Sequence, residues 1–157
     1  MAKRTTKKTS LTARIGDWYV YVILFVVSVL VRIPFLDAFD LVSYDGTYYI
    51  NQAKGFLGSP HLSGGFPIGY PVFIAALLPI VGDGVRAAQI ISFMAGIGSL
   101  FVFYALGKRL VSRRLVVVAV LVLAVTPLFV RLSLMTMSES LFIFWLLLGL
   151  LFFAAHK

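Results

Sequence analysis

The sequence predicts an all-helical protein that crosses a membrane several times. Of its 157 residues, 61% are hydrophobic and only 13% are charged, whereas about a quarter of the residues in a soluble domain are charged. The mean hydropathy is +0.99, so the chain lacks the polar side chains that a water-exposed surface needs. Its length allows about four or five spans of ~20 residues with their loops. Composition therefore excludes a disordered chain, a disulfide scaffold and a soluble nucleic-acid-binding domain.

A basic segment followed by a long apolar run opens the chain. Residues 1–16 are rich in Lys and Arg and predict a cytoplasmic tail. Residues 17–36 predict the first transmembrane helix, about 30 Å long at 1.5 Å per residue. We expect an uncleaved anchor rather than a signal peptide, because no small-residue cleavage site follows the apolar run. Arg32 lies near the outer end of this span, where its long side chain can reach the lipid headgroups.

Residues 37–84 predict an external loop, because proline and glycine are dense there and indicate several turns. Within it, residues 45–57 have helical periodicity beside a membrane boundary and predict an amphipathic interfacial helix. Residues 70–81 are apolar but would form a helix only about 18 Å long, too short to cross a bilayer. We therefore expect two juxtamembrane helices in this loop.

The distribution of basic residues decides how many times the chain crosses the membrane. By the positive-inside rule, the basic clusters and the C-terminus share the cytoplasmic side, which requires an even number of crossings between them. Four spans satisfy this condition and five do not. Pro127 predicts a kink in the third span. The remaining elements are a second transmembrane helix at 85–107, a basic cytoplasmic loop at 108–114, a third span at 115–132, a short external loop at 133–138 and a fourth span at 139–155.

The predicted external face gathers most of the acidic residues. Asp45 and Glu139 both begin predicted helices, where free amides and the helix dipole favour a carboxylate. Helix stabilisation is therefore one interpretation of both, and Ser43 would cap the first helix equally well. The other interpretation is that the two carboxylates converge on one cavity beneath the interfacial helices. The acidic residues on this face are Asp37, Asp40, Asp45, Asp83 and Glu139.

Four further residues of this face could bind ligands. His61 could bind a metal, but a lone histidine with no partner at a fixed spacing is more often an ordinary loop residue. Lys54, Arg86 and Arg131 could bind a phosphate, although contact with lipid headgroups is the commoner use of such cations. The sequence contains no phosphate-binding glycine loop, zinc-protease motif or serine nucleophile elbow.

The order of several short motifs resembles a known family, and the likeness covers nearly the whole chain after about residue 15. The chain resembles the N-terminal portion of the GT-C class of membrane glycosyltransferases, in particular the protein O-mannosyltransferases and the lipid A aminoarabinose transferases. The motifs are Asp45-Gly-Thr-Tyr-Tyr-Ile-Asn-Gln-Ala-Lys-Gly-Phe, Phe66-Pro-Ile-Gly-Tyr-Pro-Val-Phe, Arg86-Ala-Ala-Gln-Ile-Ile-Ser, Gly107-Lys-Arg and Ser138-Glu139-Ser.

This resemblance implies a reaction and a donor. A hexosyl or pentosyl group would leave a polyprenyl phosphate at the extracytoplasmic face of the cell membrane, and Asp45 would accept the proton of the acceptor hydroxyl. Tyr48 and Tyr49 of the juxtamembrane helix would contact the substrate. This sequence departs from the family pattern at Gly46, because many relatives have an acidic pair where this chain has Asp45 followed by glycine.

The resemblance also implies roles for residues outside the first loop. Glu139 would hold a divalent cation or orient the donor, and its oxygen ligands suit Mg or Mn. His61 is the other metal-ligand candidate. Arg86 and Arg131 would contact the phosphate of the donor.

Family members of this type have more spans than four, and this difference leaves an alternative function open. We expect a truncated chain, a split-gene subunit, or a minimal relative that assembles with itself or with a further membrane subunit. The alternative is a non-catalytic subunit that keeps the scaffold and binds a polyprenyl phosphate lipid or partner helices. A transporter or channel is disfavoured because no span carries a buried acid.

Overall fold

The computed structural model of the chain describes residues 5–36, 42–59 and 66–156, with side chains from residue 18 onward. Every regular element within these ranges is helical, so the predicted all-helical class is confirmed. The elements are α1 (Thr5–Arg32), the 3-10 helix η1 (Ile33–Phe35), α2 (Tyr44–Phe56), α3 (Gly69–Val81), α4 (Gly84–Leu110), α5 (Arg113–Val125), α6 (Pro127–Leu132) and α7 (Glu139–Ala155).

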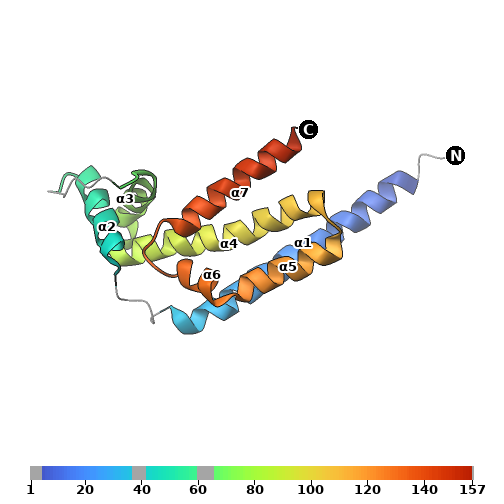
Figure 1. The fold of residues 1–157 in the computed structure, drawn as a ribbon, viewed down its shortest axis with the longest axis horizontal. Coiled ribbons are helices and arrows are strands. Elements are labelled where there is room, and N and C mark those ends of the chain that lie inside the picture. The colour runs from blue at the N-terminus through green and yellow to red at the C-terminus, as the bar shows by residue number, and fades with distance from the viewer. Residues whose placement is uncertain (1–4, 37–41, 60–65, 157) are drawn as a thin grey trace.

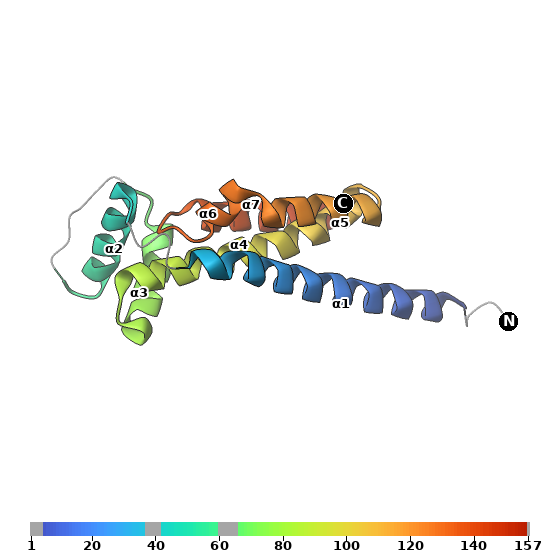
Figure 2. The same cartoon turned by 90° about the horizontal axis from the view of Figure 1, so that it is seen from below.

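Helix α4 is the axis around which the other helices are arranged. Helix α7 packs along one side of α4, and α1 and α5 lie together on the other (Figure 1). Helices α2 and α3 pack against each other and against α4 at one end of the molecule. In both Figure 1 and Figure 2, α1 begins and α7 ends away from the end that carries α2 and α3.

Two clusters of buried apolar side chains divide α4 into halves. The first half of α4 packs beneath α2 and α3, where it contributes small residues that let these helices approach closely. The second half packs between α1 and α5. The first cluster includes Tyr49, Ile50, Tyr70, Ile74, Ala88, Ala95 and Leu141, and the second includes Leu24, Leu100, Tyr104, Val116, Val120 and Phe129.

Two described helices are long and apolar enough to cross a membrane, namely the Trp18–Phe35 segment and α4. Helices α3 and α7 are apolar but shorter, with 13 and 17 residues. The third predicted span is divided at Pro127 into α5 and α6. The helices therefore agree with a membrane protein, whereas the count of four spans stays a prediction.

The basic loop predicted at 108–114 is shorter than expected. Lys108 and Arg109 belong to the last turn of α4, and α5 already begins at Arg113. Only residues 111–112 connect the two helices. Basic residues in the last turn of a helix are favoured by its dipole, which explains why α4 continues through them.

The prediction that Arg32 reaches the lipid headgroups is wrong. Its side chain is 0% exposed, and its Nε donates a hydrogen bond to Ser133 Oγ at 2.7 Å. Its Nη1 lies 3.0 Å from the Ser28 carbonyl oxygen and 3.5 Å from that of Ala124. The helix break before Pro127 leaves the Ala124 carbonyl without its usual amide donor. Arg32 therefore turns inward because the broken helix offers it acceptors.

Candidate functional site

The helix caps show which acidic residues stabilise a helix end and which do not. Ser43 is the N-cap of α2, and its Oγ accepts a hydrogen bond from the Gly46 amide at 3.0 Å. Asp83 caps α4 in the same way, because its Oδ1 accepts from the Arg86 amide at 2.8 Å. Asp45 lies in the first turn of α2 and is not its N-cap. The carboxylate of Asp45 is therefore not required for capping, and the alternative cap at Ser43 is confirmed.

The start of α2 lies directly against the connection between α6 and α7. A Cβ atom built on Gly46 would collide with the Thr136 hydroxyl and would lie 2.7 Å from the Thr136 carbonyl oxygen. The Thr136 hydroxyl is buried and has no hydrogen-bond partner. Any side chain at this position would push α2 away from the connection, which gives a steric reason for glycine after Asp45.

One turn further along α2, Tyr49 reaches the residue that precedes α7. Tyr49 is buried, and its hydroxyl lies 3.1 Å from Ser138 Oγ. Glu139 follows at once as the first residue of α7. The first two turns of α2 therefore contact the connection that leads into α7, and we call this region the α2–α7 junction, comprising Asp45, Gly46, Tyr49, Thr136, Ser138 and Glu139.

A buried hydroxyl pair lies beneath the junction. The hydroxyl of Tyr70 on α3 lies 2.7 Å from Ser92 Oγ on α4 and 2.9 Å from the Ala88 carbonyl oxygen, and either atom can accept its single proton. Ser92 Oγ in turn donates to the Met137 carbonyl at 3.1 Å. Burial raises the pKa of Tyr70, and the negative charge of Glu139 raises it further.

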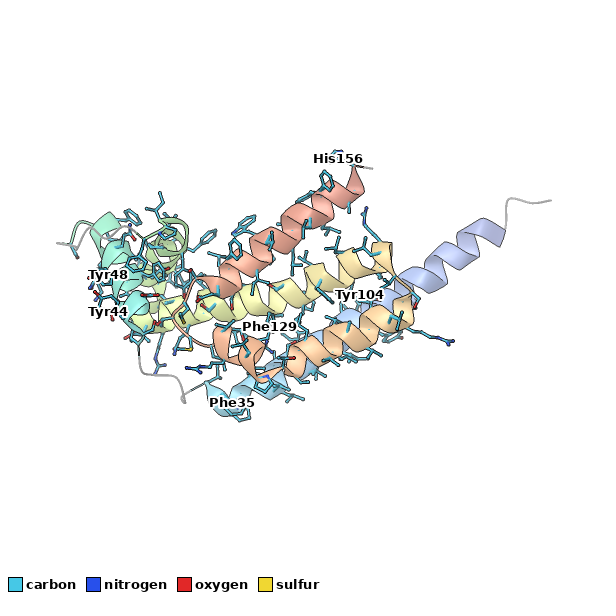
Figure 3. The ribbon with its side chains drawn as sticks, in the orientation of Figure 1. Phe35, Tyr44, Tyr48, Tyr104, Phe129 and His156 are labelled. Atoms are coloured by element: carbon cyan, nitrogen blue, oxygen red, sulfur yellow. The ribbon has the colours of Figure 1, made fainter. Side chains whose placement is uncertain are left out.

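An aromatic group lies on the outer side of α2. Tyr44 is 73% exposed, and its hydroxyl is 2.9 Å from that of half-buried Tyr48 (Figure 3). The Tyr48 ring also contacts Phe66, with 5.2 Å between ring centroids. The hydrogen bond with Tyr48 raises the pKa of Tyr44, and the charge of Asp45 adds to this effect. Sequence reasoning missed Tyr44, although its spacing of four residues from Tyr48 places both on one helix face.

The other residues that the sequence predicts to bind ligands have no described contact with the junction. Arg86 and Arg131 are exposed, and Arg131 Nε lies 3.3 Å from Met135 Sδ. His61 lies outside the described residues. Among the described side chains, no group of three or more His, Cys, Asp or Glu residues comes together. These described side chains do not supply the oxygen-rich donor set that Mg or Mn prefers.

Comparison with known proteins identifies the family. No curated protein and no solved structure matches the chain. The sequence model of the dolichyl-phosphate-mannose-protein mannosyltransferase family matches residues 66–157, more than half of the chain. The matched region includes Glu139, Arg86 and Arg131, whereas Asp45, Tyr48 and Tyr49 precede it. The helices, the apolar surface and this match agree that the chain belongs to the dolichyl-phosphate-mannose-protein mannosyltransferase family, a GT-C type of membrane glycosyltransferase.

Proposed function

We propose that the chain transfers a sugar from a polyprenyl-phosphate-linked donor to an acceptor hydroxyl at the extracytoplasmic face of the membrane. Membership of the mannosyltransferase family supports the donor class and the membrane setting. The observation that supports the assignment of the site is the α2–α7 junction, where the helix that carries Asp45 contacts the connection that leads into Glu139. The exposed Tyr44 ring and the half-buried Tyr48 ring beside Asp45 offer a surface for the acceptor.

In the proposed reaction, the oxygen of the acceptor hydroxyl forms a new bond to the anomeric carbon of the sugar. The bond between that carbon and the phosphate oxygen breaks, and polyprenyl phosphate leaves with the electron pair. Asp45 accepts the hydroxyl proton as the nucleophile attacks. Glu139 orients the donor from the first turn of α7. The exposed side chains of Arg86 and Arg131 bind the phosphate of the donor.

The test is transfer from dolichyl-phosphate mannose in proteoliposomes, with a hydroxyl-bearing peptide and an oligosaccharide as probe acceptors. Asp45→Asn keeps the size of the side chain but removes the base, so we expect kcat to fall by at least about 100-fold. The matched control is Asp83→Asn, which removes a carboxylate from the start of another helix while keeping a good capping group. We expect this control to transfer sugar at the natural rate.

Two outcomes would contradict the proposal. Full activity of Asp45→Asn would exclude Asp45 as the base. If the natural chain binds dolichyl-phosphate mannose but forms no product with either acceptor, the proposed transfer fails and a non-catalytic lipid-binding subunit becomes the better description.

A further inference from the structure

The connection that carries Glu139 is held by hydrogen bonds from helices far away in the sequence. Tyr49 of α2 bonds to Ser138, 89 residues later in the chain, at 3.1 Å. Ser92 of α4 bonds to the Met137 carbonyl, 45 residues later, at 3.1 Å. Tyr70 of α3 bonds to Ser92 at 2.7 Å. The two residues immediately before Glu139 are thus bonded to three different helices, directly or through one hydroxyl.

These hydroxyls are buried, so their geometry is restrictive. Tyr49, Tyr70 and Ser92 are 5%, 3% and 0% exposed. A buried hydroxyl that loses its partner pays the full desolvation penalty, because no water replaces the lost bond. The connection, whose Met137 and Ser138 are half-buried, therefore cannot shift relative to α2 and α4 without breaking the hydrogen bonds of the buried Tyr49 and Ser92 hydroxyls.

The rings of the two tyrosines are held independently of their hydroxyls. Tyr49 and Tyr70 contact each other edge to face, with 5.2 Å between ring centroids, and Tyr49 contacts Phe66 at 5.5 Å. Phenylalanine would keep these ring contacts, so the packing alone does not require the hydroxyl groups. The feature that needs the hydroxyl groups is the hydrogen bonding, from Tyr49 to Ser138 and from Tyr70 to Ser92 and the Ala88 carbonyl.

We propose that Tyr49 and Tyr70 are positioning residues, whose hydrogen bonds through Ser138 and Ser92 fix Glu139 against the start of α2 for sugar transfer. This inference rests on the proposed function and names residues that act through the turn rather than on the substrate. It predicts that Tyr49→Phe and Tyr70→Phe each lower kcat by about tenfold, the effect of one lost hydrogen bond in the transition state. KM for the donor stays unchanged because donor binding is not removed.

The matched control is Tyr104→Phe. Tyr104 is equally buried, but it lies near the other end of α4. Its hydroxyl oxygen accepts a hydrogen bond from Nε of Arg113 on α5 at 3.4 Å. We expect this variant to keep the natural kcat. Pairing supplies a second control: Ser138→Ala should match Tyr49→Phe, and the double variant should lose no more than either single one. Ser138→Thr keeps a hydroxyl and should restore most of the activity.

Position itself can be measured without any activity, because the chain has no cysteine. Spin labels at Lys54→Cys on α2 and Phe142→Cys on α7, both exposed positions, report the distance between the two helices. We expect Tyr49→Phe and Tyr70→Phe to broaden the distance distribution, and Tyr104→Phe to leave it unchanged. An unchanged distribution in both tyrosine variants would overturn the proposal, whatever their activity.

The outcomes separate this inference from the proposed function. A broadened distribution with unchanged kcat, beside an inactive Asp45→Asn, overturns the positioning role and leaves the function standing. A broadened distribution in a chain whose Asp45→Asn variant is fully active supports the role of the tyrosines in holding the turn while the assignment of Asp45 fails.

Discussion

Gly46 shows how one missing side chain sets the geometry of the site. Its backbone touches Thr136, both at the hydroxyl and at the carbonyl oxygen. A carbonyl oxygen belongs to the main chain, so it cannot rotate away from an added methyl group as a flexible side chain would. The residue after Asp45 is therefore restricted to glycine for a steric reason.

The prediction at this scale concerns Gly46→Ala. We expect it to lower the free energy of unfolding by about 1–3 kcal/mol, the usual cost of overpacking a tight contact, and to lower sugar transfer because α2 moves away from α7. The matched control is Gly69→Ala in α3, where an added Cβ meets nothing within 4 Å. Unfolding by SDS in mixed micelles measures the free energy of unfolding of both alanine variants. Equal stability of the two alanine variants would contradict the contact between Gly46 and Thr136.

At the scale of the elements, the break between α5 and α6 is linked to a buried cation on α1. Arg32 Nη2 is buried and has no hydrogen-bond partner. The hydroxyl of Ser28, one turn away, is also buried and without a partner. A buried charge without a carboxylate is costly in an apolar environment. Arg32 therefore contributes less to stability than its hydrogen bonds suggest, and it locks α1 to the break in one arrangement.

This linkage predicts opposite effects for the two partners. We expect Arg32→Met to leave the free energy of unfolding unchanged or to raise it, because the uncompensated charge disappears. Ser133→Ala should lower it by about 1–3 kcal/mol, because Arg32 Nε then has no acceptor. The double variant should lose less of its free energy of unfolding than Ser133→Ala alone.

The control for this pair is Ser99→Ala, a buried serine that bonds only to the Ala95 carbonyl of its own helix at 2.8 Å. Ser99→Ala should lower the free energy of unfolding only slightly, because the Ala95 carbonyl still accepts its backbone hydrogen bond within α4. A strong destabilisation by Arg32→Met, measured in the same micelles, would show that the charge is compensated and would contradict the argument.

On the scale of the whole molecule, the two ends differ in charge. The acidic residues with described side chains, Asp45, Asp83 and Glu139, belong to the first turns or caps at the end formed by α2, α3 and the start of α7. At the opposite end, the last turn of α4 and the first turn of α5 carry four basic residues, Lys108, Arg109, Arg113 and Arg114. Lys108 Nζ lies over the rings of Tyr104 and Tyr21, at 4.7 Å and 5.8 Å from their centroids. This polarity favours the predicted orientation with the basic end in the cytoplasm.

Single cysteines test the orientation in a chain that has none of its own. We expect Lys54→Cys to react with a membrane-impermeant maleimide added outside intact cells, whereas Arg114→Cys and His156→Cys react only after the membrane is opened. One crossing then separates Lys54 from Arg114, and two separate Arg114 from His156. Labelling of Lys54→Cys and Arg114→Cys from the same side would mean that α3 also crosses the membrane, and the count of four spans would be wrong.

Much of the helical pattern follows from local sequence. Apolar length, the proline at 127 and the serine before Tyr44 are local signals, and they lie close to the ends of α5 and α2 as folded. Periodicity is a weaker guide on α2: among its apolar side chains, Tyr49 and Ala53 are buried, but Phe56 is 49% exposed. The exposed end of a short helix extends past its neighbours, and periodicity does not reveal where the neighbours stop.

The sequence by itself determined the class of protein, the approximate helices and the family, because these depend on composition, local periodicity and motif order. Only the tertiary structure decided that Arg32 turns inward, that Gly46 meets Thr136, and that Tyr49 and Ser92 hold the turn before Glu139. These contacts join residues 45 to 101 positions apart. They depend on how the helices rotate and pack against one another, which no local pattern along the chain specifies.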